Sequence, residues 1–174
     1  MFLTQWNSRF KAHNCRCQDA APGVVASQAR FGLYVTAIML LTHQEIAGKL
    51  RQAGLRPTRQ RMALAQILFN AGDRHVNAEA LHGEAMKARV PVSLATVYNT
   101  LNQFTEAGLL REVAIEGNLS YFDTNTSNHF HYFLEEKGQL VDICADEVEV
   151  RGLPVLPEGT EIDRIDVIVR LKRR

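Results

Sequence analysis

The stretch VSLATVYNTLNQFTEAG, residues 92–108, decides the fold of this chain. Its apolar side chains recur at helical spacing and are Leu94, Val97, Leu101 and Phe104. This spacing predicts an amphipathic helix. Ser93 can cap the first turn, and Gly108 can end the helix because glycine readily adopts the left-handed conformation found there.

The opposite face of this predicted helix carries almost no charge. It offers Ala95, Asn99 and Asn102, with Thr96, Tyr98 and Thr100 beside them. A helix that only has to stay soluble usually carries Lys and Glu on this side. Amide and small side chains instead suit the major groove, where they meet adenine and the thymine methyl group. We therefore predict a recognition helix, with an ordinary core-packing helix as the alternative.

The composition excludes two classes of protein. The chain has 174 residues, of which 46% are hydrophobic and 22% charged, and a formal net charge of +1. The length fits one full core or two small domains. The composition and net charge exclude a disordered tail protein and a strongly basic architectural protein. The composition does not exclude DNA binding, because a local cluster of basic residues matters more for phosphate contact than the net charge of the whole chain.

Such a cluster lies at Arg51, Arg56, Arg59 and Arg61. Thr58 is expected to cap a helix over 58–69, which puts Arg59 and Arg61 in its first turn. Arginine is the unfavourable charge at this end of a helix dipole unless an anion lies there, and a DNA phosphate would supply one. Solvated arginines at a helix start are the alternative.

Signals along the chain predict two domains. Residues 42–125 contain predicted helices at 42–53, 58–69, 78–88 and 92–108, then strand-like runs at 109–115 and 119–122. Three or four helices closed by a hairpin make a winged helix-turn-helix domain. Residues 126–174 contain predicted strands at 129–134, 139–143 and 162–171. The expected fold class is α+β, an N-terminal winged helix-turn-helix domain followed by a small α/β dimerisation domain.

The second domain is too short for a robust core of its own. We therefore expect a homodimer, and a two-fold dimer would suit a palindromic double-stranded DNA target.

Residues 1–41 show no clear periodic pattern of apolar residues, and we expect either a disordered extension or a wrongly assigned start upstream of Met39. Three cysteines without a C-x-x-C pair favour a reducing cytoplasm, and the longest apolar run, 31–41, is too short to span a membrane.

His129 and His131 give the sharpest chemical signal. On a strand, residues i and i+2 point to the same face, so both imidazoles can reach one ion while Phe130 faces the core. Asp142 is expected in the partner strand, with Asp123 and His75 as further candidates. Imidazole and carboxylate together suit zinc, manganese or iron(II). An ion held by both domains could fix the angle between them and so change DNA affinity. An incidental H-x-H sequence is the alternative.

The chain resembles the ferric uptake regulator (Fur) superfamily. The motifs are AGLRPTRQR, HVNAEALH, VSLATVYNTLNQFTEAGLL and H-x-H followed by a strand with an acidic residue. Within this superfamily, the iron response regulator (Irr) subfamily is most similar in four motifs, which are GLRPTRQR, GDRHV, VPVSLATVYNTLNQFTEAGLLREV and YFDTN. The resemblance covers about residues 42–174. It implies a dimeric regulator that binds AT-rich palindromic operators of iron-uptake, iron-storage and haem-synthesis genes.

The resemblance also implies roles for individual residues. Tyr98 matches a tyrosine that reads the groove, while Arg56 and Arg61 match backbone and minor-groove contacts. The expected DNA-binding residues are Arg56, Thr58, Arg59, Arg61, Ser93, Ala95, Thr96, Tyr98 and Asn99. The expected metal ligands are His75, Asp123, His129, His131 and Asp142. Leu134 and Lys137 replace the structural-zinc cysteines of many members, and Asn128 and Phe130 replace ligands of an additional site, of which Glu149 remains.

An Irr-type protein would bind DNA when iron is scarce and respond to haem, with His129 and His131 as candidate haem ligands. The Irr interpretation also predicts a haem-synthesis enzyme as a partner. The alternative is an ordinary Fur-type repressor with Fe(II), Mn(II) or Zn(II) as corepressor. A cytoplasmic metalloenzyme is the second alternative. We expect no enzyme, because the sequence lacks H-E-x-x-H, a nucleophile elbow and a glycine-rich phosphate loop.

Overall fold

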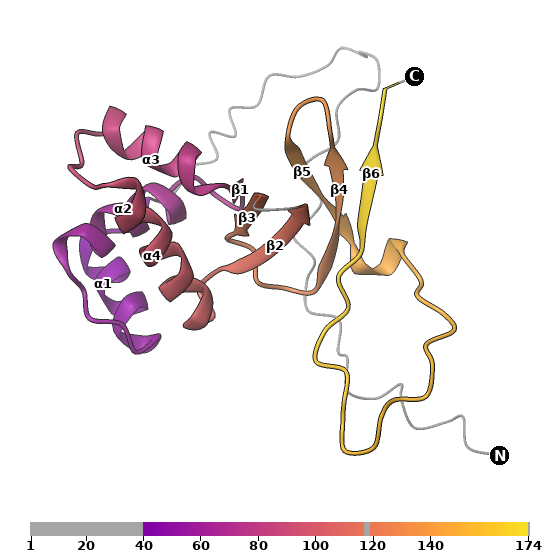
Figure 1. The fold of residues 1–174 in the computed structure, drawn as a ribbon. Coiled ribbons are helices and arrows are strands. Elements are labelled where there is room, and N and C mark those ends of the chain that lie inside the picture. The colour runs from indigo at the N-terminus through magenta and orange to yellow at the C-terminus, as the bar shows by residue number, and fades with distance from the viewer. Residues whose placement is uncertain (1–39, 117–118, 174) are drawn as a thin grey trace, which may run out of the picture. The chain divides into compact units, whose positions relative to one another are not determined.

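The computed structural model describes residues 40–116 and 119–173, which divide into two compact units at Ser127 (Figure 1). The expectation of a disordered or wrongly assigned extension over residues 1–41 falls almost entirely outside the described residues. The helices lie in the first unit. None of the described helices has the length and apolar character needed to cross a membrane.

The first unit contains four α-helices, each within two residues of its predicted bounds. They are α1 (His43–Gln52), α2 (Arg59–Phe69), α3 (Ala78–Lys87) and α4 (Leu94–Glu106). Each begins after a capping residue whose side-chain oxygen accepts a hydrogen bond from a first-turn amide: Thr42, Thr58, Asn77 and Ser93. These bonds satisfy amide groups that have no partner inside the helix, which explains why the helices begin at these positions.

The start of α1 is a capping box. The Thr42 amide donates to the Glu45 carboxylate over 2.7 Å, and the Glu45 amide donates to the Thr42 hydroxyl over 3.2 Å. The backbone and side-chain hydrogen bonds from Thr42 lower the pKa of Glu45. Both hydrogen bonds of a capping box are therefore present, which fixes the start of α1 at this position.

The helices share one core, to which α4 contributes Val97, Leu101 and Phe104. Two expectations for α4 are wrong. Leu94, predicted on the apolar face, is 37% exposed because it is the first residue of the helix and lies at the edge of the apolar stripe. Thr100, predicted on the polar side, is buried. Its hydroxyl donates to the Thr96 carbonyl over 2.8 Å, which satisfies the hydroxyl and allows it to be buried.

A three-stranded antiparallel sheet completes the first unit. Its strands are β1 (His75–Val76), β2 (Arg111–Glu116) and β3 (Leu119–Asp123), in the order β1-β3-β2. The β2–β3 hairpin was predicted. β1 was not, because two residues are too short for any periodic pattern. This short strand matters, because it places His75 opposite Asp123.

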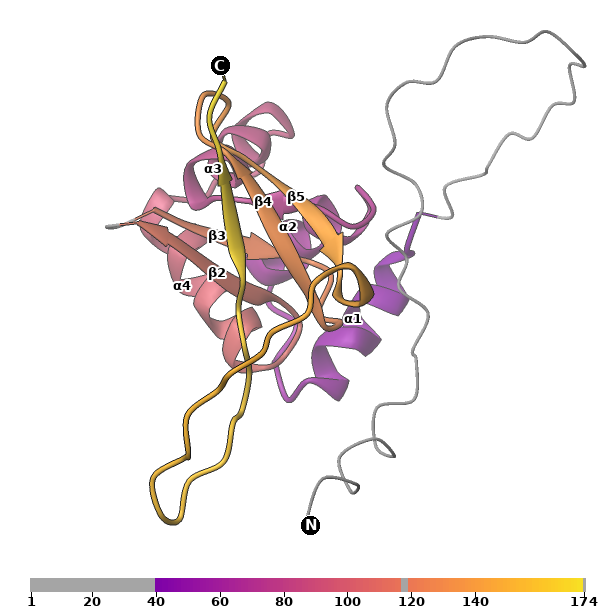
Figure 2. The ribbon, with the colours of Figure 1, turned by 90° about the vertical axis from the view of Figure 1, so that its right-hand side faces the viewer.

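The second unit is a sheet of β4 (His129–Leu134), β5 (Gln139–Cys144) and β6 (Ile168–Leu171), in the order β5-β4-β6 (Figure 2). β4 pairs antiparallel with β5 and parallel with β6. The predicted strand at 162–171 is too long, since regular pairing begins only at Ile168. Within residues 127–173 the helical content is one 3-10 turn, η2 (Ala145–Glu147), less than an α/β domain would have.

Candidate metal ligands and nucleic-acid interface

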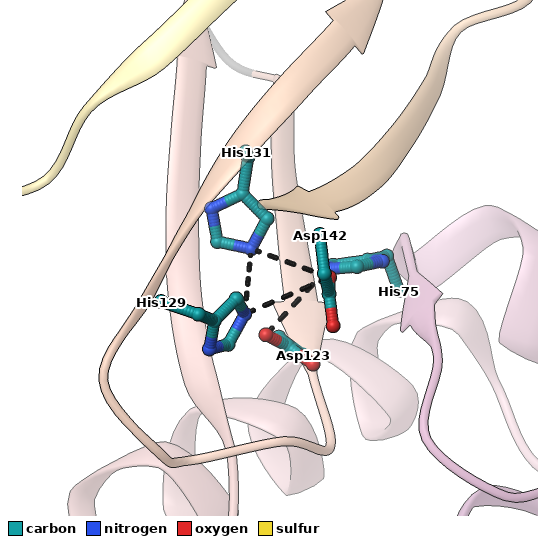
Figure 3. Close-up of side chains that lie close together, drawn as sticks. All are labelled: His75, Asp123, His129, His131 and Asp142. Carbon is teal, nitrogen blue, oxygen red and sulfur yellow. Dashed lines mark hydrogen bonds and ion pairs between the residues drawn. The ribbon is translucent and has the colours of Figure 1, made fainter. Parts of the chain in front are cut away.

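In the second unit, His129, His131 and Asp142 point toward one another (Figure 3). His129 and His131 alternate along β4, and Asp142 on β5 is the strand partner of His131. The two Nε2 atoms lie 3.0 Å apart, and they lie 3.6 Å and 3.9 Å from Asp142 Oδ1. Phe130 between them is buried, as predicted. The strand pattern therefore brings the two imidazoles and a carboxylate together.

The backbone orients one of these imidazoles. His129 Nδ1 lies 2.9 Å from the Ser127 carbonyl oxygen, which can only accept a hydrogen bond. Nδ1 therefore carries a proton in this contact, and Nε2 is the nitrogen directed at His131. A backbone carbonyl on the distal ring nitrogen is the usual outer-shell partner of a metal-binding histidine. This role of Ser127 could not be predicted from the spacing of residues in the sequence.

The separations among these donor atoms fit a shared cation. Two ligands of one tetrahedral zinc ion lie about 3.3 Å apart, given Zn–N and Zn–O distances of about 2.0–2.2 Å. One donor atom from each of His129, His131 and Asp142 lies within 4.8 Å of the others. The donor set is nitrogen and oxygen without sulfur, which suits zinc, manganese or iron(II).

The first unit holds a second imidazole and carboxylate pair (Figure 3). His75 Nε2 lies 3.5 Å from Asp123 Oδ2, and Asp123 is fully buried. The other oxygen of Asp123 accepts a hydrogen bond from the Asn125 amide over 2.8 Å. The pairing of β1 with β3 thus produces two further groups of metal-ligand type, both predicted from the sequence.

The polar side of α4 is a surface. Ser93, Ala95 and Asn99 are exposed, Tyr98 is 37% exposed, and Thr96 is half-buried. The Ser93 and Thr96 hydroxyls lie 2.9 Å apart, so each has a partner at the start of the helix. These five residues are therefore accessible to a macromolecule, as a recognition helix requires, and Tyr98 and Asn99 are not part of the core.

Tyr98 has a partner that the sequence analysis missed. Its hydroxyl donates a hydrogen bond to Glu79 Oε1 on α3 over 2.7 Å. This bond to a carboxylate raises the pKa of Tyr98. The two residues are nineteen apart in sequence, so no local pattern links them.

The arginines at the start of α2 differ from one another. Arg56 and Arg59 are exposed, whereas Arg61 is half-buried. Arg61 donates from Nε and Nη2 to Gln103 Oε1 over 3.0 Å and 2.8 Å, and from Nη1 to the Arg56 carbonyl over 3.0 Å. Arg61 therefore joins the start of α2 to the last turns of α4.

We expect Gln103→Ala to lower the free energy of unfolding by about 1 kcal/mol, because it leaves the Arg61 guanidinium without two of its hydrogen bonds. Urea unfolding of the full chain measures this change. The control is Asn102→Ala, an exposed amide on the same helix, which should change stability by less than about 0.5 kcal/mol. Equal effects of the two substitutions would contradict a structural role for the contact.

Comparison with known proteins places the chain in a family. The family profile described as FUR, ferric uptake regulator family, matches residues 52–170. The chain belongs to the ferric uptake regulator family. The family resemblance in the sequence is thereby confirmed, and the Irr subfamily stays a prediction.

Relatives and solved structures agree with this membership in the ferric uptake regulator family. The peroxide-responsive repressor PerR of Staphylococcus epidermidis is 36% identical over 110 residues, covering 61% of this chain and 72% of PerR. PerR of Staphylococcus aureus is 37% identical over 100 residues, covering 57% of this chain and 66% of that protein. The ferric uptake regulator from Pseudomonas aeruginosa with manganese is 29% identical, with a TM-score of 0.57 over 73% of this chain and 96% of that one. The Vibrio cholerae ferric uptake regulator, at 23% identity and a TM-score of 0.58 over 73% and 98%, supports the fold alone.

Proposed function

We propose that this member of the ferric uptake regulator family is a transcriptional regulator that binds double-stranded DNA as a homodimer. The observation that carries the proposal is the exposed, uncharged polar face of α4, from Ser93 to Asn99. Helices α2 to α4 followed by the β2–β3 hairpin have the element order of a winged helix-turn-helix domain. In this proposal α4 enters the major groove, and Arg56, Thr58, Arg59 and Arg61 lie along the backbone.

Dimerisation is proposed for the second unit. β5 and β6 each pair with β4 on one side, so each has an outer edge in the described sheet. Tyr132, Val169 and Leu171 of this sheet are exposed, at 37%, 37% and 42%. Exposed apolar side chains on a small sheet favour burial against another surface. A second copy of this chain would bury them and place two α4 helices on one palindrome.

We propose that one divalent cation is bound by His129, His131 and Asp142 together with His75 and Asp123. The support is the nitrogen and oxygen chemistry of both groups and the short donor separations within each. The cation would supply positive charge that holds the two carboxylates and three imidazoles in one arrangement. An ion with ligands from both units would thereby couple cation concentration to operator affinity.

The finer proposal is an Irr-type regulator that binds operators when iron is scarce and responds to haem through His129 and His131. It rests on four sequence motifs, GLRPTRQR, GDRHV, VPVSLATVYNTLNQFTEAGLLREV and YFDTN. A metal-dependent repressor is the second candidate, favoured by the histidine and aspartate cluster of the second unit. In both candidates the chain is a regulator and not an enzyme, and its relative PerR of Staphylococcus epidermidis is a peroxide-responsive repressor.

Operator binding by the purified full chain tests the proposal. AT-rich palindromic duplexes are titrated in a gel-shift assay without additive and with Mn(II), Zn(II), Fe(II) or haem. We expect Tyr98→Ala to lower operator affinity about tenfold, because it removes a base-contacting side chain worth about 1–3 kcal/mol. The matched control is Met86→Ala, an exposed residue of α3, which should have no effect.

The titrations with added metal or haem distinguish the Irr-type regulator from the metal-dependent repressor. Release by haem without any requirement for a divalent metal supports the Irr-type regulator, and a requirement for divalent metal supports the repressor with a metal corepressor. Operator affinity should fall steeply with salt in both cases. Absence of sequence-specific binding under all conditions would overturn the proposal of DNA recognition.

A further inference from the structure

The hydrogen bond between Tyr98 and Glu79 joins two exposed side chains on different helices. Tyr98 lies on the exposed face of α4, and Glu79 is the second residue of α3. The hydroxyl donates to Oε1 over 2.7 Å. This bond is charge-assisted, and bonds of this type are shorter and stronger than bonds between neutral groups.

The helix cap at Asn77 fixes the turn of α3 that carries Glu79, independently of Tyr98. Asn77 caps α3 by accepting a hydrogen bond from the Ala80 amide over 2.8 Å. The cap fixes the first turn, and a carboxylate in a first turn is favoured by the helix dipole. Tyrosine has only two side-chain torsions, so one hydrogen bond at its hydroxyl is enough to restrict the direction of the exposed ring.

The charge of Glu79 is not neutralised within the described chain. Glu84, one and a half turns further along α3, forms a salt bridge with Arg74 over 2.6 Å. Among residues 40–116 and 119–173, by contrast, Glu79 has Tyr98 as its hydrogen-bond partner and no basic residue within salt-bridge distance. An acidic group beside a surface that approaches phosphates weakens binding to any DNA sequence.

We propose that Glu79 is a positioning and specificity-determining residue of the DNA-binding surface. Its carboxylate directs the ring of Tyr98 toward the base that Tyr98 reads. Its negative charge opposes phosphate approach, so that DNA lacking the matching base binds poorly. The inference rests on the proposed function, because it requires α4 to be the helix that reads DNA.

Two substitutions separate the two effects. Glu79→Gln keeps an oxygen acceptor for the Tyr98 hydroxyl and removes the charge, so affinity for a non-operator duplex should rise about two- to fivefold. Glu79→Ala also removes the acceptor, so the ratio of operator to non-operator affinity should fall by about fivefold relative to Glu79→Gln. Glu106→Gln, the same charge change at the end of α4, is the matched control and should leave that ratio unchanged.

A double-mutant cycle tests the contact itself. Tyr98→Phe should weaken operator binding in the native background and have no further effect in the Glu79→Ala background, because the hydroxyl has then lost its partner. In the free protein, the pKa of the Tyr98 phenol should fall in Glu79→Gln, measured by NMR. Additive effects in the cycle, or Glu79 variants that behave like Glu106→Gln, would overturn the inference.

The result for Tyr98→Ala separates this inference from the proposed function. If Tyr98→Ala binds the operator as the native chain does, α4 is not the reading helix and both proposals fail. If Tyr98→Ala binds weakly while the Glu79 variants match the control, the role of Glu79 alone is wrong. Circular dichroism of each variant confirms that these exposed substitutions leave the fold intact.

Discussion

Replacing His131 with alanine should lower the affinity of the chain for zinc by a factor of at least about 100. Removal of outer-shell partners already costs metal sites about 10- to 100-fold, and His131 is proposed as a direct ligand. Its Nε2 atom lies 3.0 Å from that of His129, so the substitution removes one of the two imidazoles in this cluster. Competition titration against a chromophoric chelator measures the affinity.

The control for this experiment is His43→Ala. His43 is exposed as the first residue of α1, so its removal also takes away one imidazole but should leave zinc affinity unchanged. Asp123→Asn extends the test to the first unit, and a comparable loss is expected if one ion takes ligands from both groups. Native zinc affinity in His131→Ala would exclude the proposed site.

Replacing Phe104 with alanine should lower the free energy of unfolding by about 3–5 kcal/mol, the usual range for truncating a buried aromatic side chain. Phe104 is fully buried, and its ring centroid lies 6.2 Å from that of Phe69 on α2. The substitution therefore removes apolar contacts and leaves a cavity between α2 and α4. A native domain has only about 5–15 kcal/mol of stability, so this loss is a large fraction of the total.

Urea unfolding followed by circular dichroism measures the Phe104→Ala effect. Asn102→Ala, exposed on the opposite side of α4, should stay within about 0.5 kcal/mol of the native chain. A loss below about 1 kcal/mol for Phe104→Ala would mean that α4 does not pack through this face. The polar surface would then not be the side available to DNA.

The helices could be predicted from the sequence because their signals are local. Each has a capping residue directly before an apolar stripe, and both patterns lie within about a dozen neighbouring residues. The same holds for the alternation of His129 and His131 along a strand. Phe130 between them could be assigned to the core on that pattern alone.

The remaining features depend on contacts between distant residues. The partners Arg61 and Gln103 are 42 apart, and the partners Glu79 and Tyr98 are 19 apart. The short strand β1 exists because β3 pairs with it, and no period can be read from two residues. Leu94 and Thr100 lie at the edges of the apolar stripe of α4, where the neighbouring elements decide which side chain is covered. Periodicity cannot settle such positions.

The two strand pairings of the second unit, β4 with β5 and β4 with β6, close connections of very different length. β4 and β5 are joined by a short turn and can form at once, whereas β6 must return over a long connection. Closing a long loop costs more entropy than closing a hairpin, so the hairpin is favoured as the earlier structure. His129, His131 and Asp142 all lie on that hairpin. A cation held by these three residues would therefore be bound within one hairpin, and its binding energy would contribute to the stability of that hairpin.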